Sequence, residues 1–412
     1  MKERQAVVRE LGKGYRQKTK KERGLIVDEL VRLTGYNRAY ACRALRQGGC
    51  TGRRKPQTRS RAKTYGPEVL VPLRKIWATL DGIAGKRLAP FLPEMVAVME
   101  REGELNLSAE VREKLLRISA ATIDRLLAPD RRRLMIRGRA RTKPGTLLKH
   151  QIPIRTFASW DEGRPGFLEV DLVSHDGGRP VGDWIQTLSA TDVASGWTET
   201  RACKNKAQLH VFAALLHIRR ALPFPLLGLD SDNGSEFINN HLRRYCEQEE
   251  ISFTRSRPYR KNDACFVEQK NWHVVRRTVG YVRYDTEEEL ALLNELYSLL
   301  RLMTNFFSPQ MKLRQKTRDG ARVTKRYDQA KTPYQRLLEA GALTQKAEER
   351  LGALYLSLNP AQLQRKIGAI QKRLRILAIA KLETMRKEAI ATEDLEHLLA
   401  EEAIPELEYI LT

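Results

Sequence analysis

The chain has 412 residues, of which 74 are basic and 50 acidic, so its formal net charge at pH 7 is +24. A surplus this large repels itself unless a polyanion shares the surface, and nucleic acid is the commonest such partner. No run of about 18 apolar residues exists, and the N-terminus has no apolar signal core. We therefore expect no membrane partner and a cytoplasmic location.

The length suggests about two to four domains. The five cysteines form no C-x-x-C pair, and the seven histidines are scattered, so the sequence does not indicate a zinc site. Reduced thiols in a cytoplasmic protein are the simpler interpretation.

Residues 1–50 are predicted to form a helix-turn-helix DNA-binding unit. Apolar residues between Leu25 and Leu33 follow helical spacing, Thr34-Gly35 interrupts it, and an arginine-rich helix follows from Asn37 to Gln47. Its candidate DNA contacts are Arg38, Arg43 and Arg46. An ordinary helical hairpin with a solvated basic face is an equally good interpretation.

Residues 51–66 hold six basic residues and no acid, which predicts a basic linker. Such a linker can lie along a DNA groove, and its candidate contacts are Arg53, Arg54 and Lys55. A solvated tether is the alternative.

Residues 67–128 are predicted to form a second helical DNA-binding unit. Ser119 is a suitable N-cap for a short helix that ends near Leu127 and carries Thr122 and Arg125. A recognition helix and a plain packing helix fit this pattern equally. A second basic linker follows over 129–160, with Arg139, Arg141 and Lys143 as candidate DNA contacts.

Residues 161–285 change character and predict an α/β domain with a mixed sheet. Strands are expected at 167–173, 184–190 and 197–202, then a helix at 206–222, a strand at 226–229, a helix at 235–249, a strand at 251–254 and a helix at 263–279. Residues 286–412 are predicted to be helical throughout and to serve in oligomerisation or DNA contact.

Three carboxylates occur where this α/β domain would bring them together. Asp171 lies within the first strand, Asp232 just after a short apolar strand, and Glu268 near the start of the last helix. Phosphodiester cleavage must stabilise anionic attacking and leaving oxygens, and two divalent ions do this in many nucleases and polymerases. Mg²⁺ prefers oxygen ligands, so a few carboxylates suffice. We expect two Mg²⁺ ions on these acids, with Mn²⁺ as a substitute.

Other acids compete for these roles. Asp230 shares strand parity with Asp232, so either could face the metals. Turn roles are favoured for Asp176, Asp183 and Asp192. For Glu236 an interaction with a helix N-terminus is favoured, and for Asp263 a helix-capping role.

The segment from Gly166 to about Gly280 resembles the catalytic core of the retroviral-integrase superfamily, most of all bacterial insertion-sequence transposases. The resemblance rests on the segments Leu168–Asp171, Ser231–Phe237, Arg257–Tyr259 and Phe266–Asn271. Thirty-five residues lie between Asp232 and Glu268, which is the family's own spacing, and the family register selects Asp232 over Asp230.

The resemblance implies a ribonuclease-H-like fold and a DNA transposase acting near the bacterial nucleoid. Metal-dependent hydrolysis would free 3′ hydroxyls at transposon ends, and those hydroxyls would attack target DNA directly. A homo-oligomer on double-stranded DNA is expected, because two ends must be joined. The helical C-terminal region departs from integrases that end in a small β-barrel.

Basic residues around Glu268 are further candidates for DNA contact. Arg276 lies about two turns after Glu268 and is expected to touch phosphate, whereas Lys270 points away from that face. Arg260 and Lys261 lie in the loop before Glu268. Two rival hypotheses remain: a nuclease of this fold that cuts without joining, and a non-catalytic DNA-binding regulator.

Overall fold

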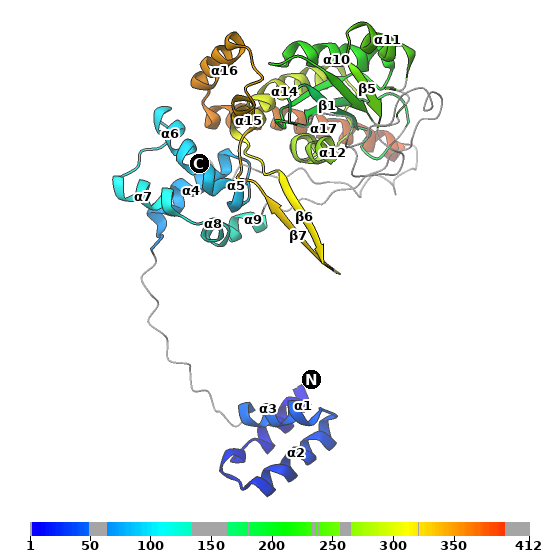
Figure 1. Cartoon of the computed structure of the whole chain (residues 1–412). Coiled ribbons are helices and arrows are strands. Elements are labelled where there is room, and N and C mark those ends of the chain that lie inside the picture. Colours follow the sequence, from blue (N-terminus) through cyan, green and yellow to red (C-terminus); the bar gives the residue numbers. More distant parts are fainter. Residues whose placement is uncertain are drawn as a thin grey trace. The chain divides into compact units, whose positions relative to one another are not determined.

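The computed structural model describes residues 2–48, 64–133, 163–179, 181–231, 234, 236–237, 239–255, 265–319 and 321–391. The chain divides into two compact units, Met1–Thr64 and Tyr65–Thr412 (Figure 1). Within the described residues, no helix is both long and apolar enough to cross a bilayer.

The first unit is a bundle of three helices: α1 (Lys2–Leu11), α2 (Lys20–Thr34) and α3 (Arg38–Gly48). Thr19 caps α2 through a capping box with Glu22, which satisfies backbone donors at the helix start. Gly35 ends α2 with a left-handed φ of 70°, a conformation that glycine adopts without strain. The helices bury a small core of Tyr15, Val27, Leu30, Ala41 and Leu45.

The second unit begins with a helical module, residues 65–133. It consists of α4 (Pro67–Thr79), α5 (Gly85–Leu88), α6 (Leu92–Arg101), α7 (Ala109–Arg117), α8 (Ala120–Leu126) and α9 (Ala128–Arg133). The Ser119 side chain accepts a hydrogen bond from the backbone N–H of Thr122, so it caps α8. Trp77 is fully buried at the centre of the module, and its indole donates to the carbonyl of Ile83 at 2.9 Å.

The helical module packs directly on the rest of its unit, and their apolar residues form one continuous core. Glu94 of α6 accepts hydrogen bonds from Gln335 at 2.5 Å and from Tyr355 at 2.7 Å. Glu104 forms an ion pair with Arg365 at 2.6 Å. The module is therefore part of the same packed body as the sheet.

The centre of the second unit is a five-stranded mixed sheet with the order β3-β2-β1-β4-β5. Its strands are β1 (Phe167–Ser174), β2 (Gln186–Asp192), β3 (Thr198–Cys203), β4 (Gly228–Ser231) and β5 (Ser252–Arg255). The first three strands pair antiparallel, whereas β4 pairs parallel with both β1 and β5. The expected mixed sheet is present, with each strand within two residues of its predicted range.

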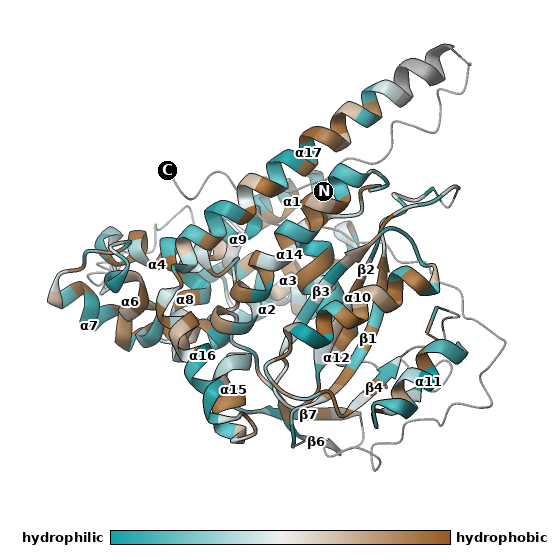
Figure 2. Cartoon of the chain, turned by 90° about the horizontal axis from the view of Figure 1, so that it is seen from above, coloured by the Kyte–Doolittle hydropathy of each residue, from teal (hydrophilic) through white to brown (hydrophobic). Residues whose placement is uncertain are grey.

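Helices cover this sheet, and Figure 2 shows brown, apolar faces on several of them. They are α10 (Gln208–Ala221), α11 (Asn240–Gln248), α12 (Cys265–Lys270), a π-helix at Asn271–Arg276, α13 (Arg277–Val279) and α14 (Glu287–Phe307). Helix α14 lies along the outer edge of β3. Asn294 bonds the N–H and C=O of Ala202, and Asn305 bonds those of Thr198.

The C-terminal region contains a β-hairpin as well as helices, so the prediction of helix throughout 286–412 is wrong over 313–327. Strands β6 (Leu313–Asp319) and β7 (Arg322–Tyr327) pair antiparallel and precede α15 (Pro333–Ala340), α16 (Gln345–Ser357) and α17 (Pro360–Ala391). The segment alternates threonine, valine and tyrosine with charged residues, which favours strand over helix. Asp319-Gly320 is also a favoured hairpin-turn dipeptide. Helix α17 packs along α14.

Candidate active site

The parallel pairing of β1 and β4 brings acidic positions together at one end of the sheet. Glu169 pairs in register with Asp230, and Val170 pairs with Ser231, the last residue of β4. Asp171 is therefore the next position along β1 at the carboxyl end of this pairing. Asp232, which follows β4 in the sequence, lies outside the described residues.

Two described residues, Asn271 and Leu172, donate hydrogen bonds to Asp171. Its Oδ2 atom accepts from Nδ2 of Asn271 at 2.6 Å, and its Oδ1 atom accepts from the backbone N–H of Leu172 at 2.8 Å. Asn271 begins the π-helix that continues α12. Glu268 lies three residues earlier, about one helical turn, and residues at this spacing share a helix face. Glu268 is exposed to solvent.

Glu169 docks this helix onto the strand. Its carboxylate is fully buried and accepts a hydrogen bond from the backbone N–H of Val267 at 3.1 Å. A carboxylate at a helix N-terminus satisfies a free backbone donor and interacts favourably with the helix dipole. Glu169 and Asp171 share one face of β1 because side chains alternate along a strand. The same face of β1 therefore holds α12 in place through Glu169 and carries Asp171, the candidate metal ligand.

The contacts of Glu169 and Asn271 are not predicted from the sequence. Both occur in the motifs that carry the family resemblance, but neither was assigned a role. A charged residue in an otherwise buried strand was the available signal for Glu169. No local signal existed for Asn271, since its partner lies 100 residues earlier in the chain.

The π-helix immediately follows the helix that carries Glu268. Such π-turns within α-helices are frequent at functional sites because they redirect side chains. Here Val274 and Val275 are buried, whereas Arg276 donates to the carbonyl of Ser174 at 2.6 Å and lies 4.7 Å over the ring of Tyr281. Arg276 thus lies against the protein, and its contact with DNA phosphate stays a prediction.

Lys270 lies on the other side of this helix from Glu268, as its spacing implies. It is buried, and burial together with the charges of Arg87 and Lys312 lowers its pKa to about 7. Arg87 belongs to the helical module and donates to the carbonyl of Pro309 at 2.5 Å. The inner side of the candidate catalytic helix therefore meets both the helical module and the segment that leads into the β-hairpin.

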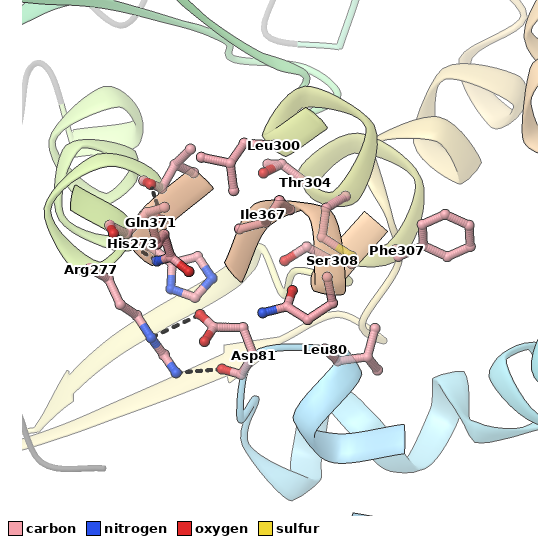
Figure 3. A pocket seen from close by; sticks show the side chains of 14 residues that line it. Leu80, Asp81, His273, Arg277, Leu300, Thr304, Phe307, Ser308, Ile367 and Gln371 are labelled. Carbon is pink, nitrogen blue, oxygen red and sulfur yellow. Dashed lines mark hydrogen bonds and ion pairs between the residues drawn. The ribbon is translucent and has the colours of Figure 1, made fainter. Parts of the chain in front are cut away.

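A partly buried ion pair fastens the helical module to the same helix (Figure 3). Arg277 pairs with Asp81 through Nε and Oδ2 at 2.9 Å and also donates to the Asp81 carbonyl. Asp81 has a left-handed φ of 55°, which is uncommon for a residue other than glycine. Beside the pair is a small cavity, lined also by His273, Gln371 and residues of α14 and α17.

The remaining candidate acids make local contacts. Asp192 accepts hydrogen bonds from the backbone N–H and hydroxyl of Ser195, as a turn residue does. Asp230 is buried and accepts from the Thr254 hydroxyl at 2.7 Å. In the described part of the chain, no three acidic, histidine or cysteine side chains form a cluster that could hold a metal ion.

The expected DNA contacts fall into two groups. Besides Arg276, those that the structure describes are on α3, where Arg38, Arg43 and Arg46 are exposed, and on α8, where exposed Arg125 donates to the Thr122 hydroxyl at 3.1 Å. Arg38 also forms an ion pair with Asp28. Eight candidates lie outside the described residues: Arg53, Arg54, Lys55, Arg139, Arg141, Lys143, Arg260 and Lys261.

Comparison with known proteins identifies the central region. A family model described as "Integrase core domain" matches residues 161–261. The chain is 44% identical over 315 residues to "Uncharacterized protein y4rM" of Sinorhizobium fredii (strain NBRC 101917 / NGR234), a match that spans 76% of this chain and 89% of the relative.

Solved integrases match this chain at low identity. The catalytic core domain of BIV integrase is 19% identical, with a TM-score of 0.29, and the match covers 43% of this chain and 95% of that chain. A chain of the simian T-cell lymphotropic virus intasome, in complex with PP2A regulatory subunit B56 gamma, is 15% identical, with a TM-score of 0.31. That match covers 61% of this chain and 73% of that chain.

The family model spans the strands that carry the paired acidic positions, and the match to y4rM extends over most of both chains. The sheet order and the helix docked on β1 agree with that assignment. The chain therefore belongs to the integrase and transposase superfamily of nucleic-acid-processing proteins with a ribonuclease-H-like core.

Proposed function

We propose that this protein is a DNA transposase, which cleaves transposon ends and joins the freed 3′ hydroxyls to target DNA. The observation that carries this proposal is the hydrogen bond from Asn271 to Asp171, because it brings the helix of Glu268 against the strand of Asp171. In this proposal Asp171 and Glu268, two of the three required acids, come from segments about 100 residues apart in the sequence and act together at one end of the sheet.

The donor set fits divalent magnesium. Asp171, Glu268 and, in the proposed site, Asp232 offer only carboxylate oxygens, which are the ligands that Mg²⁺ prefers. Two bound ions would stabilise the charge that develops on the attacking and leaving oxygens of the phosphodiester. They would also reverse the repulsion between these acids and a polyanionic substrate.

The residues around the acids have positioning roles in this proposal. Asn271 orients the Asp171 carboxylate, and a ligand held by a second hydrogen bond binds metal in a defined geometry. Glu169 fixes the first turn of the helix that presents Glu268. The chain thus sets the geometry of the ligands in advance, and no covalent intermediate with a serine or tyrosine is required.

The DNA partner is supported by the net charge of +24 and by the exposed arginines of α3 and α8. In this proposal the three-helix unit and the helical module bind the transposon end, and more than one copy of the chain assembles to join two ends. The basic segments 51–66 and 129–160 would run along the same DNA.

The test is cleavage and strand transfer with the full chain, Mg²⁺ and a labelled duplex that carries the inverted repeat flanking its gene. Asp232→Asn and Glu268→Gln should each abolish cleavage and leave DNA affinity nearly unchanged. Asp183→Asn is the matched control, because Asp183 is an exposed acid bonded to Asn205 outside the site. Normal cleavage by either site variant would refute the metal assignment.

The same assay separates the rival functions. A nuclease would release the labelled 3′ end without joining it to a second duplex. A DNA-binding regulator would bind the repeat and cut nothing under any divalent ion.

A further inference from the structure

The β-hairpin of residues 313–327, here called the basic ribbon, has a composition unlike the core. Its strand sequences, LRQKTRD and RVTKRY, hold six basic residues and one acid. This excess of five positive charges on two short paired strands is self-repulsive. A hairpin with this charge pattern is stabilised when a polyanion neutralises it.

The side chains of the basic ribbon that the structure describes are exposed. Arg314, Lys325 and Arg326 are exposed, and so are the apolar side chains of Val323 (43%) and Tyr327 (48%). Figure 1 shows β6 and β7 extending away from the other elements of their unit. An isolated two-stranded hairpin is only marginally stable in water, so a partner for these faces is expected.

The base of the ribbon, in contrast, is firmly anchored. Asp328 forms a partly buried ion pair with Arg336 at 2.8 Å and accepts from the backbone N–H of Lys312 at 2.6 Å. The Lys312 ammonium donates to the carbonyls of Val193 and Ala194, in the turn between β2 and β3. The ribbon therefore has a fixed base on the catalytic sheet.

The shape of the ribbon agrees with one polyanion in particular. The major groove of duplex DNA is about 12 Å wide and admits a two-stranded β-ribbon. Each strand here spans about 20 Å at the usual rise per residue, so it reaches over several base pairs. Arginine and lysine suit the phosphates that border the groove, and exposed valine and tyrosine can contact sugars and thymine methyl groups.

We propose that the basic ribbon is a further DNA-binding element, which enters a groove of the duplex DNA bound to the catalytic unit. This inference rests on the proposed function, because it takes DNA as the substrate. It adds a contact that neither helical unit provides, on a support bonded directly to the catalytic sheet.

The test compares two triple variants of the full chain with equal changes in charge. Arg314→Gln, Lys325→Gln and Arg326→Gln neutralise the ribbon. Lys346→Gln, Arg350→Gln and Lys366→Gln neutralise exposed cations of α16 and α17 and serve as the control. Binding to a fluorescein-labelled duplex of arbitrary sequence is measured by anisotropy over a series of salt concentrations. Thermal unfolding of each variant is followed by circular dichroism.

Loss of three phosphate contacts should reduce the slope of log K against log[salt] by about 2.7. The wild-type affinity should then fall about 40-fold more than that of the ribbon variant when the salt concentration rises fourfold. The control should keep the wild-type slope, and both variants should unfold as the wild type does. An unchanged slope for the ribbon variant, or an equal reduction in the control, would overturn the proposal.

Failure of this inference and failure of the proposed function have different signatures. If the wild type cuts DNA and the ribbon variant binds DNA normally, only the ribbon proposal falls. If the ribbon variant loses DNA contacts but the wild type cuts nothing with Mg²⁺, only the transposase proposal falls. A change in oligomer mass together with a normal salt slope would identify the ribbon as a contact between protein chains and would reject the DNA proposal.

Discussion

Asn271→Leu removes the side-chain donor that holds Asp171, and its effect can be estimated from the structure. The Nδ2 atom lies 2.6 Å from a carboxylate oxygen, and a hydrogen bond to a charged group contributes about 1.5–3 kcal/mol. If this energy is used to hold the ligand in the transition state, its loss slows cleavage about 10- to 150-fold. The same range follows from the loss of residues that orient metal ligands.

Stability should change much less than activity in this variant. The Oδ1 atom of Asn271 is buried and has no hydrogen-bond partner among the described residues, so leucine also removes an unsatisfied polar atom. The substitution is therefore expected to change the free energy of unfolding by less than about 1 kcal/mol.

The assay is single-turnover cleavage of a labelled DNA end over a Mg²⁺ titration, with urea unfolding in parallel. We expect a reduced rate together with a shift of the Mg²⁺ midpoint to higher concentration. Asn205→Leu is the matched control, because Asn205 also donates to an aspartate, Asp183, but outside the site. Wild-type rates for Asn271→Leu at limiting Mg²⁺ would refute the positioning role.

Three further predictions concern stability and docking. Arg301→Ala should cost about 3–5 kcal/mol at neutral pH, because it strands the buried Glu199 carboxylate. Burial raises the pKa of Glu199 above its usual 4.5, and Arg301 opposes that rise. The loss of stability in Arg301→Ala should therefore vanish below about pH 4.5 and grow as the pH rises through the pKa of Glu199 in the folded state. A loss that stays constant from pH 4 to pH 7 in urea unfolding would contradict this. Asp81→Asn keeps a residue that tolerates left-handed φ but breaks the partly exposed pair with Arg277, so we expect a loss of about 1–2 kcal/mol, and unchanged unfolding would reject the pairing. Leu30→Ala should lower the free energy of unfolding of the first unit alone by about 2–5 kcal/mol. Limited proteolysis should then cleave residues 2–48 first, and simultaneous cleavage of the second unit would show that the two units do not unfold independently.

The sheet and its order of helices could be predicted because each element carries its own local pattern. The strand at 167–174 alternates, and the short apolar strand before Asp232 is followed by turn residues. Asp171 and Glu268 could be selected because family spacing adds to that local pattern. The docking of the helix that carries Glu268 against β1 is a tertiary feature, which depends on Glu169 and Asn271 bridging the strand and the helix.

The structural predictions that are wrong share one physical cause. The prediction of helix over the basic ribbon extends the helical periodicity found on both sides of it, although its threonines, valine and Asp319-Gly320 favour a hairpin. The sequence predicts the helical module as a separate unit, yet Trp77, Phe91 and Met95 of this module belong to the same hydrophobic core as the sheet. Apolar periodicity identifies a buried face but does not identify the surface that covers it.

The contact between α14 and β3 limits how copies of this chain can associate. An open strand edge invites a strand of another molecule to extend the sheet. Here the side chains of Asn294 and Asn305 occupy backbone donors and acceptors of β3, so strand addition at that side is blocked. Self-association that leaves α14 in place must therefore use helices, loops or the basic ribbon on that side, and a continuous intermolecular sheet across β3 is ruled out.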